Sequence, residues 1–342
     1  MTRQSLLTSL WSLGVALGAG LAGALLFVAS AKGTLLALLL AYFAPLPLMI
    51  ASLGFGQWTG LVGALLGSGL IATLLYPSIG IVYAIGIALP AWLVCAAALR
   101  GAPPLEPQSP RRRPAQNAPA VPNAAPMRAL TAGTVLFAAS LSIGALVFAA
   151  ANGGLNSALN QLTDQLAPIV RELKNATTSL PENLDADRLA RLLVRLLIPA
   201  MAGSGLLLIM ANFWLAARTV HISARLPTPW PDIPYNLRLP VPFAAALVPA
   251  IGLIFIGHEI GFVAAIVAAA LATALSLQGL AVMHDLTRGM SARTPILFGA
   301  YLLLSLIPPW PMPVFTIIGL IDAALGLRER KRLRQSAPPP SI

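Results

Sequence analysis

Residues 260–283 spell IGFVAAIVAAALATALSLQGLAVM. The stretch contains no charged side chain, and an α-helix needs about 20 apolar residues to cross the hydrocarbon core of a bilayer. Its amide groups would all be hydrogen-bonded within the helix, as lipid requires. Residues 260–283 therefore predict a transmembrane helix.

The composition of the whole chain agrees with that prediction. Hydrophobic residues make up 57% of the 342 residues, charged residues only 10%, and the mean hydropathy is +0.81. A soluble domain is about a quarter charged, because charge keeps its surface hydrated. Lipid is therefore the solvent for most of this protein's surface.

Further apolar runs predict an all-α, polytopic transmembrane bundle of about ten spans, with eight or nine as alternatives. Besides 260–283, they cover 10–30, 33–51, 56–75, 78–99, 129–151, 193–217, 241–258, 294–308 and 312–327. Prolines 308, 309, 311 and 313 separate the last two runs. Proline lacks an amide donor and disfavours a helical residue before it, which favours a hairpin of two short spans. The alternative is one kinked span over 294–327.

The basic residues predict which side each loop faces. Cytoplasmic loops are enriched in Lys and Arg, and a cytoplasmic N-terminus places most of the 22 basic residues inside, including Arg111–Arg113 and the cluster at 328–334. Both termini are therefore predicted to be cytoplasmic. Arg3, the first apolar run and Ala29-Ser30-Ala31 also imitate a cleavable signal peptide, but we expect this run to be kept as the first span.

Changes in composition divide the chain. Residues 1–100 form a four-span half, 101–127 a disordered cytoplasmic linker rich in Pro, Ala and Arg, and 128–334 a six-span half. Residues 335–342 are a disordered tail. Within the second half, the outside segment 152–190 carries an apolar helical stripe, formed by Leu155, Leu159, Leu162, Leu166, Ile169 and Leu173. Pro168 should kink or end that helix, which is either a lid on the bundle or a partner-binding surface.

Common catalytic and cofactor motifs do not fit their required context. Gly18–Gly23 matches the dinucleotide pattern GxGxxG but lies inside a span, where small residues serve close helix packing. There is no phosphate-binding Walker loop, Cys95 is the single cysteine, and the three histidines lack metal-ligand spacing. We therefore expect no cofactor, no metal and no enzyme activity. The net charge of +11 is expected to orient the protein in the bilayer rather than to bind nucleic acid.

Ionisable residues near the membrane are the best candidates for a site, since charge in lipid is costly. Six polar residues gather at the inner ends of the last spans: Gln278, His284, Asp285, Arg288, Arg293 and Asp322. They are either a structural ion-pair cluster that fixes these spans or a polar site open to the cytoplasm. Arg288 or Arg293 is the expected partner of Asp322. A second candidate, His258-Glu259, lies at an outer turn.

The same region carries a resemblance to a known family. Residues 278–284, QGLAVMH, then Arg288-Gly289, Arg293, Tyr301, Pro308-Pro309, GLID at 319–322 and RER at 328–330 resemble the C-terminal signature of the YybS-like family of predicted bacterial membrane proteins. The resemblance implies a bacterial cytoplasmic (inner) membrane protein of unknown function. That family is distantly similar to the substrate-capturing components of energy-coupling-factor transporters.

Two functions follow as expectations. The first is a transporter-like or ligand-binding membrane protein without its own ATPase activity, whose small-molecule ligand the sequence does not identify. The second is a structural or interaction protein of the cell envelope. Its protein partner would bind the helices at 155–195 or the basic C-terminal tail.

Overall fold

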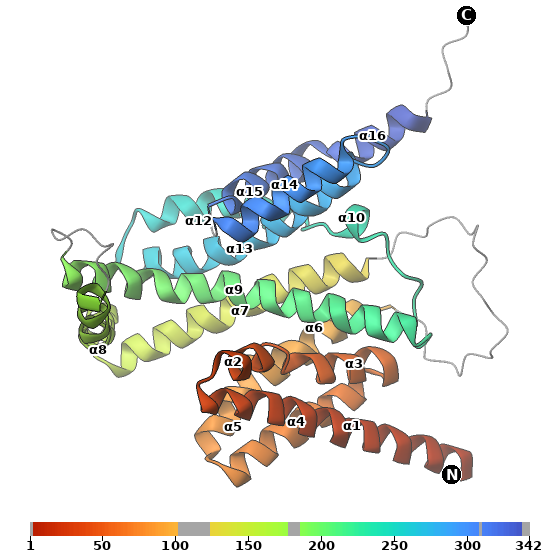
Figure 1. Cartoon of the computed structure of the whole chain (residues 1–342), viewed down its shortest axis with the longest axis horizontal. Helices are drawn as coiled ribbons and strands as arrows, with labels where there is room; N and C mark the ends of the chain where they lie inside the picture. Colours follow the sequence, from red (N-terminus) through yellow and green to blue (C-terminus); the bar gives the residue numbers. More distant parts are fainter. Residues whose placement is uncertain (1–2, 102–123, 177–184, 308–309, 337–342) are drawn as a thin grey trace, which may run out of the picture. The chain divides into compact units, whose positions relative to one another are not determined.

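The structure, a computed structural model, describes residues 3–101, 124–176, 185–307 and 310–336 (Figure 1). Throughout these ranges the regular elements are helices, and no strand occurs among them. This confirms the predicted all-α class. Most of the predicted linker and tail lies outside the described residues.

Seven helical stretches are long and apolar enough to cross a membrane: Leu10–Lys32, Leu35–Phe55, Gln57–Leu74, Pro77–Leu99, Ala125–Ala151, Ala186–Ile222 and His258–Leu286. Three shorter apolar helical stretches cover Val241–Ile254, Arg293–Leu306 and Met312–Leu325. Each predicted span overlaps one of these stretches. The protein is thus a multi-pass helical membrane protein.

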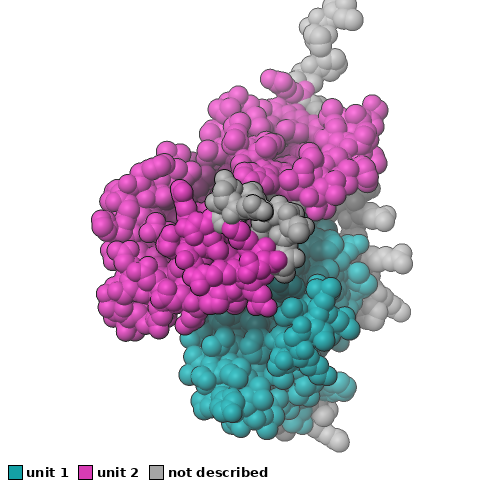
Figure 2. Space-filling view, turned by 60° about the vertical axis from the view of Figure 1, so that its left-hand side comes forward, with its two compact units in different colours: residues 1–133, 207–238 teal, residues 134–206, 239–342 magenta. Residues whose placement is uncertain are grey.

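The chain folds into two compact units (Figure 2). Unit 1 comprises Met1–Gly133 and Leu207–Arg238, and unit 2 comprises Thr134–Leu206 and Leu239–Ile342. Two of the three boundaries fall inside α7 (Ala125–Ala151) and α9 (Ala186–Ile222), and the third lies between Arg238 and Leu239. This division by contacts differs from the predicted one, in which a linker at 101–127 separates a first half, 1–100, from a second half, 128–334.

Unit 1 is held together by small residues where helices cross. Its first six α-helices are α1 (Arg3–Ala29), α2 (Leu35–Ala41), α3 (Pro45–Phe55), α4 (Gln57–Leu74), α5 (Pro77–Tyr83) and α6 (Leu89–Leu99), with a π-helical turn at Ala84–Ala88. Gly20 of α1 lies against the backbone of Gly63 and Gly67 of α4, with no room for a Cβ at any of the three. Gly20 and Gly23 of the pattern at 18–23 therefore serve helix packing, as predicted, whereas nothing lies within 4 Å of the missing Cβ of Gly18.

The second span is interrupted, which the apolar run at 33–51 did not reveal. α2 ends at Ala41 and α3 begins at Pro45. Proline has no amide donor, and the Leu46 amide turns to the Phe43 carbonyl instead of continuing the α-helical pattern. The buried Asn212 side chain of α9 donates to the Tyr42 carbonyl at 2.9 Å. A polar side chain from another helix thus satisfies the backbone where the span breaks.

In unit 2, α8 (Leu155–Ala176) rests on the neighbouring helices. Leu155 and Leu159 pack with Ala149 of α7 and Val194 of α9, and Arg171 forms an exposed 2.6 Å ion pair with Asp187. The helix continues through Pro168. At the end of the stripe, Ile169 and Leu173 are each 61% exposed. Ala167 and Val170 form the buried contact there, with Ala190 of α9.

The remaining helices of unit 2 are α11 (Val241–Ala245), α12 (Leu247–Ile254), α13 (His258–Leu286), α14 (Arg293–Leu306), α15 (Met312–Leu325) and α16 (Leu327–Ser336). A short helix, α10 (Ile233–Asn236), precedes them in unit 1. The proline-rich stretch separates α14 from α15, as predicted, although Pro308 and Pro309 lie outside the described residues. Figure 1 shows α13 and α15 running alongside each other.

Candidate functional site

In unit 2, α13 and α15 cross at very close range. A Cβ added to Gly279 would collide with the Phe315 carbonyl, and one added to Gly319 would collide with the Leu275 carbonyl. Only glycine therefore allows this approach. One turn earlier on each helix, the Ser276 and Thr316 hydroxyls are 2.8 Å apart, and Thr316 also donates to the Ala272 carbonyl. The two backbones are thus held within hydrogen-bonding reach of each other's side chains.

Asp322 lies one turn beyond Gly319 and forms a buried ion pair with Arg328. The Arg328 Nη2 and Nε atoms donate to its Oδ2 at 2.6 and 3.1 Å, and the Arg328 amide donates to its Oδ1 at 3.3 Å. The two side chains are 0% and 3% exposed. Gly326 makes this possible: its φ of 61°, which a residue with a side chain rarely adopts, ends α15 and changes the direction of the chain before α16.

The prediction that Arg288 or Arg293 would pair with Asp322 was therefore wrong. Arg328 is six residues away in sequence, and the glycine turn returns it to the same helix end. Pairing two residues that are close in sequence closes a shorter loop, and therefore costs less chain entropy, than pairing residues of two distant helices.

Gln278 joins the ion pair to two further segments. Its Nε2 donates to Asp322 Oδ2 at 3.0 Å and to the Gly319 carbonyl at 3.3 Å, and its Oε1 accepts from the Leu239 amide at 2.7 Å. The side chain is 1% exposed. Gln278 therefore connects α13, α15 and the segment entering α11 through a network with well-placed donors and acceptors.

The end of α13 carries a second set of contacts. Lys331 of α16 donates to the carbonyls of Asp285, Leu286 and Arg288 at 2.8–3.1 Å. The last carbonyls of a helix have no partner within it, so this ammonium group caps α13. The buried Asp285 carboxylate pairs with Arg288 at 3.3 Å.

The six predicted cluster residues thus separate into smaller groups. Gln278 meets Asp322, Asp285 meets Arg288, and His284 lies 2.8 Å from the Tyr301 hydroxyl. Arg293 begins α14. The sequence analysis missed Arg328 and Lys331 as members of the cluster. Gly326 was the available signal, because glycine just after a helix commonly marks the helix end.

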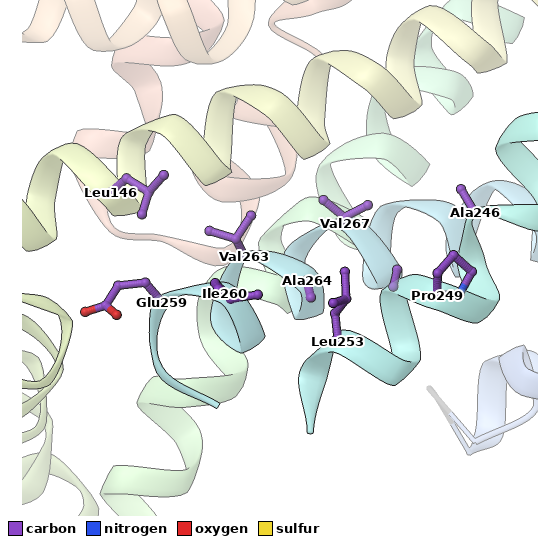
Figure 3. A pocket seen from close by; sticks show the side chains of 10 residues that line it. Leu146, Ala246, Pro249, Leu253, Glu259, Ile260, Val263, Ala264 and Val267 are labelled. Carbon is purple, nitrogen blue, oxygen red and sulfur yellow. The ribbon is translucent and has the colours of Figure 1, made fainter. Parts of the chain in front are cut away.

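A different region of unit 2 contains an open groove of about 490 Å³ (Figure 3). Its walls come from α7, α12, Ala246 just before α12, and the first half of α13. Ten residues line it: Leu146, Ala246, Pro249, Ala250, Leu253, Glu259, Ile260, Val263, Ala264 and Val267. None of the six cluster residues is among them. The groove has the size of a ligand site, but its lining is almost entirely hydrocarbon.

Glu259, one of the two outer-turn candidates, is the charged residue of that lining (Figure 3). It lies in the first turn of α13 and is exposed. A carboxylate there interacts favourably with the helix dipole. His258 precedes it with a φ of 51°, in the left-handed region. The Glu259 carboxylate points away from the other labelled side chains, so the groove has aliphatic walls with a carboxylate just beyond one end (Figure 3).

Within the described residues, no group of three or more His, Cys, Asp or Glu side chains could hold a metal ion. In comparisons with protein-family models, with curated proteins and with solved structures, nothing matches the chain.

Proposed function

We propose that this protein is a ligand-binding membrane protein without ATPase or other chemical activity of its own, and that its ligand is lipid-like. The observation that carries the proposal is the aliphatic groove between α7, α12 and α13. A groove lined by hydrocarbon and set among membrane helices suits an alkyl chain. Its volume of about 490 Å³ lies within the range of about 300–1,000 Å³ that is usual for small-molecule sites.

Glu259 indicates the chemistry of the ligand's polar end. The carboxylate lies at the N-terminal end of α13, next to the aliphatic wall formed by Ile260 and Val263. A cationic group at the end of an alkyl chain would meet an opposite charge there, whereas an anionic group would be repelled. An alkylammonium compound, or a lipid with an ammonium headgroup, is therefore the favoured ligand class.

The polar cluster at the other end of α13 is better explained as a structural brace. Asp322 is bonded to Arg328 and Gln278, and all three are buried. A ligand would have to break this network before it could bind. We therefore assign ligand binding to the groove.

Photolabelling tests the groove. We expect a long-chain alkylammonium photoprobe to label the purified full chain on α7, α12 or α13, and Val263→Trp to reduce that labelling at least fivefold by filling the groove. Val263 lies in the wall. The matched control is Val248→Trp: Val248 on α12 is 64% exposed and does not line the groove.

Glu259→Gln tests the contact with the ligand's headgroup separately from the contact with its alkyl chain. It should remove the preference for the alkylammonium probe over an alkyl sulfate probe of equal length, while labelling by an uncharged alkyl alcohol probe persists. Labelling of other helices, or equal labelling of Val263→Trp and the wild type, would contradict the proposal.

The topology belongs to the same proposal: ten spans, with both termini in the cytoplasm of a bacterium and the bundle in its inner membrane. The distribution of arginines and the resemblance to the YybS-like family support it. The three shorter apolar stretches supply the additional spans. A reporter that is active only in the periplasm should be inactive when fused after Ala115 and active after Leu180. The reverse pattern would invert the orientation.

One observation favours the second candidate, an envelope protein that binds a partner. Ile169 and Leu173 of α8 stand one helical turn apart, and both are largely exposed. Together they form a small apolar face beside the exposed Arg171–Asp187 pair. Crosslinking from a photoreactive residue at position 173 would test it: a protein adduct obtained in intact cells supports this candidate.

A further inference from the structure

The C-terminal helix α16 is docked onto unit 2 rather than extending freely from it. Arg328 is fully buried against Asp322, and Lys331 caps the end of α13. These contacts fix α16 where α13 ends at Leu286 and α15 ends at Leu325. Since both are membrane helices, α16 begins where their hydrophobic segments end.

Because one side of α16 is docked, the residues on its opposite side are the exposed ones. Arg328 and Lys331 stand three residues apart and therefore share one face. Arg330 and Arg334, one turn apart, are both exposed, and Leu333 is 70% exposed. The free side of α16 thus offers two guanidinium groups beside an aliphatic side chain.

The surrounding charge is strongly positive. Among the described residues from 284 onward, the acids are Asp285, Asp322 and Glu329. The first two are buried and paired with arginines. The basic residues of that part are Arg288, Arg293, Arg328, Arg330, Lys331, Arg332 and Arg334.

We propose that the free side of α16 binds the phosphate groups of anionic phospholipids. Guanidinium groups form paired, charge-assisted hydrogen bonds with phosphate. Basic residues next to a membrane span attract anionic lipid with about 1 kcal/mol each. Leu333 would enter the upper acyl region, as the apolar residues of surface helices do. Because α16 is already docked, the arginines bind without first paying the entropy of ordering a flexible tail.

The test uses the full chain in nanodiscs of phosphatidylcholine that contain a minor fraction of phosphatidylglycerol. Spin-labelled lipids report the association of each lipid with the protein. The wild type is expected to prefer phosphatidylglycerol, and the preference should fall when salt is added. The double variant Arg330→Gln/Arg334→Gln should weaken that preference about tenfold or more, as two contacts of this kind predict.

The matched control removes the same charge elsewhere in unit 2. Arg188 and Arg195 are exposed arginines of α9, in a segment that also carries Asp185 and Asp187. Arg188→Gln/Arg195→Gln should keep the preference. Equal loss in both double variants, or no loss in the α16 variant, would overturn the proposal, and the latter outcome would favour an acidic protein as the partner of α16. Because Arg328 and Lys331 stay in place, both variants should unfold like the wild type in phosphatidylcholine alone.

Discussion

Replacing Arg328 with methionine is expected to lower the free energy of unfolding by about 3–5 kcal/mol, the usual cost of leaving one charge of a buried ion pair without its partner. Asp322 would keep Gln278 as a hydrogen-bond donor, but its counter-ion would be gone. Mixed-micelle titration with sodium dodecyl sulfate, followed by tryptophan fluorescence, measures this loss.

Two further variants identify the cause. Asp322→Leu/Arg328→Met removes both charges and should recover most of the stability, since apolar residues often replace a buried ion pair at little cost. Arg171→Gln breaks an ion pair of the same length, 2.6 Å, but its side chains are 58% and 45% exposed. That change should cost less than about 1 kcal/mol. If Arg328→Met cost no more than Arg171→Gln, the buried pair would not brace the C-terminal helices.

The apolar runs predicted the helices well, because in lipid hydrophobicity is itself the constraint on the fold. The helix that contains 260–283 begins at His258 and ends at Leu286. The break at Tyr42 was missed for a related reason: the residues around it are as apolar as those of an intact span. Pro45 and Pro47 were the available signal, but the structure also needs Asn212, far away in sequence, to complete the break.

Helical spacing predicted the candidate cluster only in part. It explains why Asp285 and Arg288 pair, since residues three apart are neighbours on a helix, but Arg288 or Arg293 had been expected to pair with Asp322. It could not choose the partner of Asp322, because that choice depends on how the chain turns at Gly326. Nothing in the sequence indicated the groove beyond Glu259, because the apolar residues that line it cannot be distinguished in the sequence from other apolar residues of a span.

Replacing Gly279 with alanine is expected to destabilise the protein by about 2–3 kcal/mol, near the upper end of the usual cost of overpacking. The added methyl group would meet the Phe315 carbonyl and lie 3.1 Å from the Gly319 amide nitrogen. These are backbone atoms, so they cannot rotate away as a side chain would. Separating α13 from α15 would also lengthen the hydrogen bonds from Gln278 to Gly319 and Asp322, which cross the same interface.

Gly299 provides the control for this substitution. It also lies inside an apolar helix, α14, but nothing lies within 4 Å of the position of its missing Cβ. Gly299→Ala should therefore be neutral or stabilising by up to about 1 kcal/mol, the difference in helix propensity between the two residues. The same mixed-micelle titration compares the two variants. A Gly279→Ala variant as stable as Gly299→Ala would mean that α13 and α15 can move apart without loss, and that the buried Gln278–Asp322–Arg328 network does not depend on their close approach.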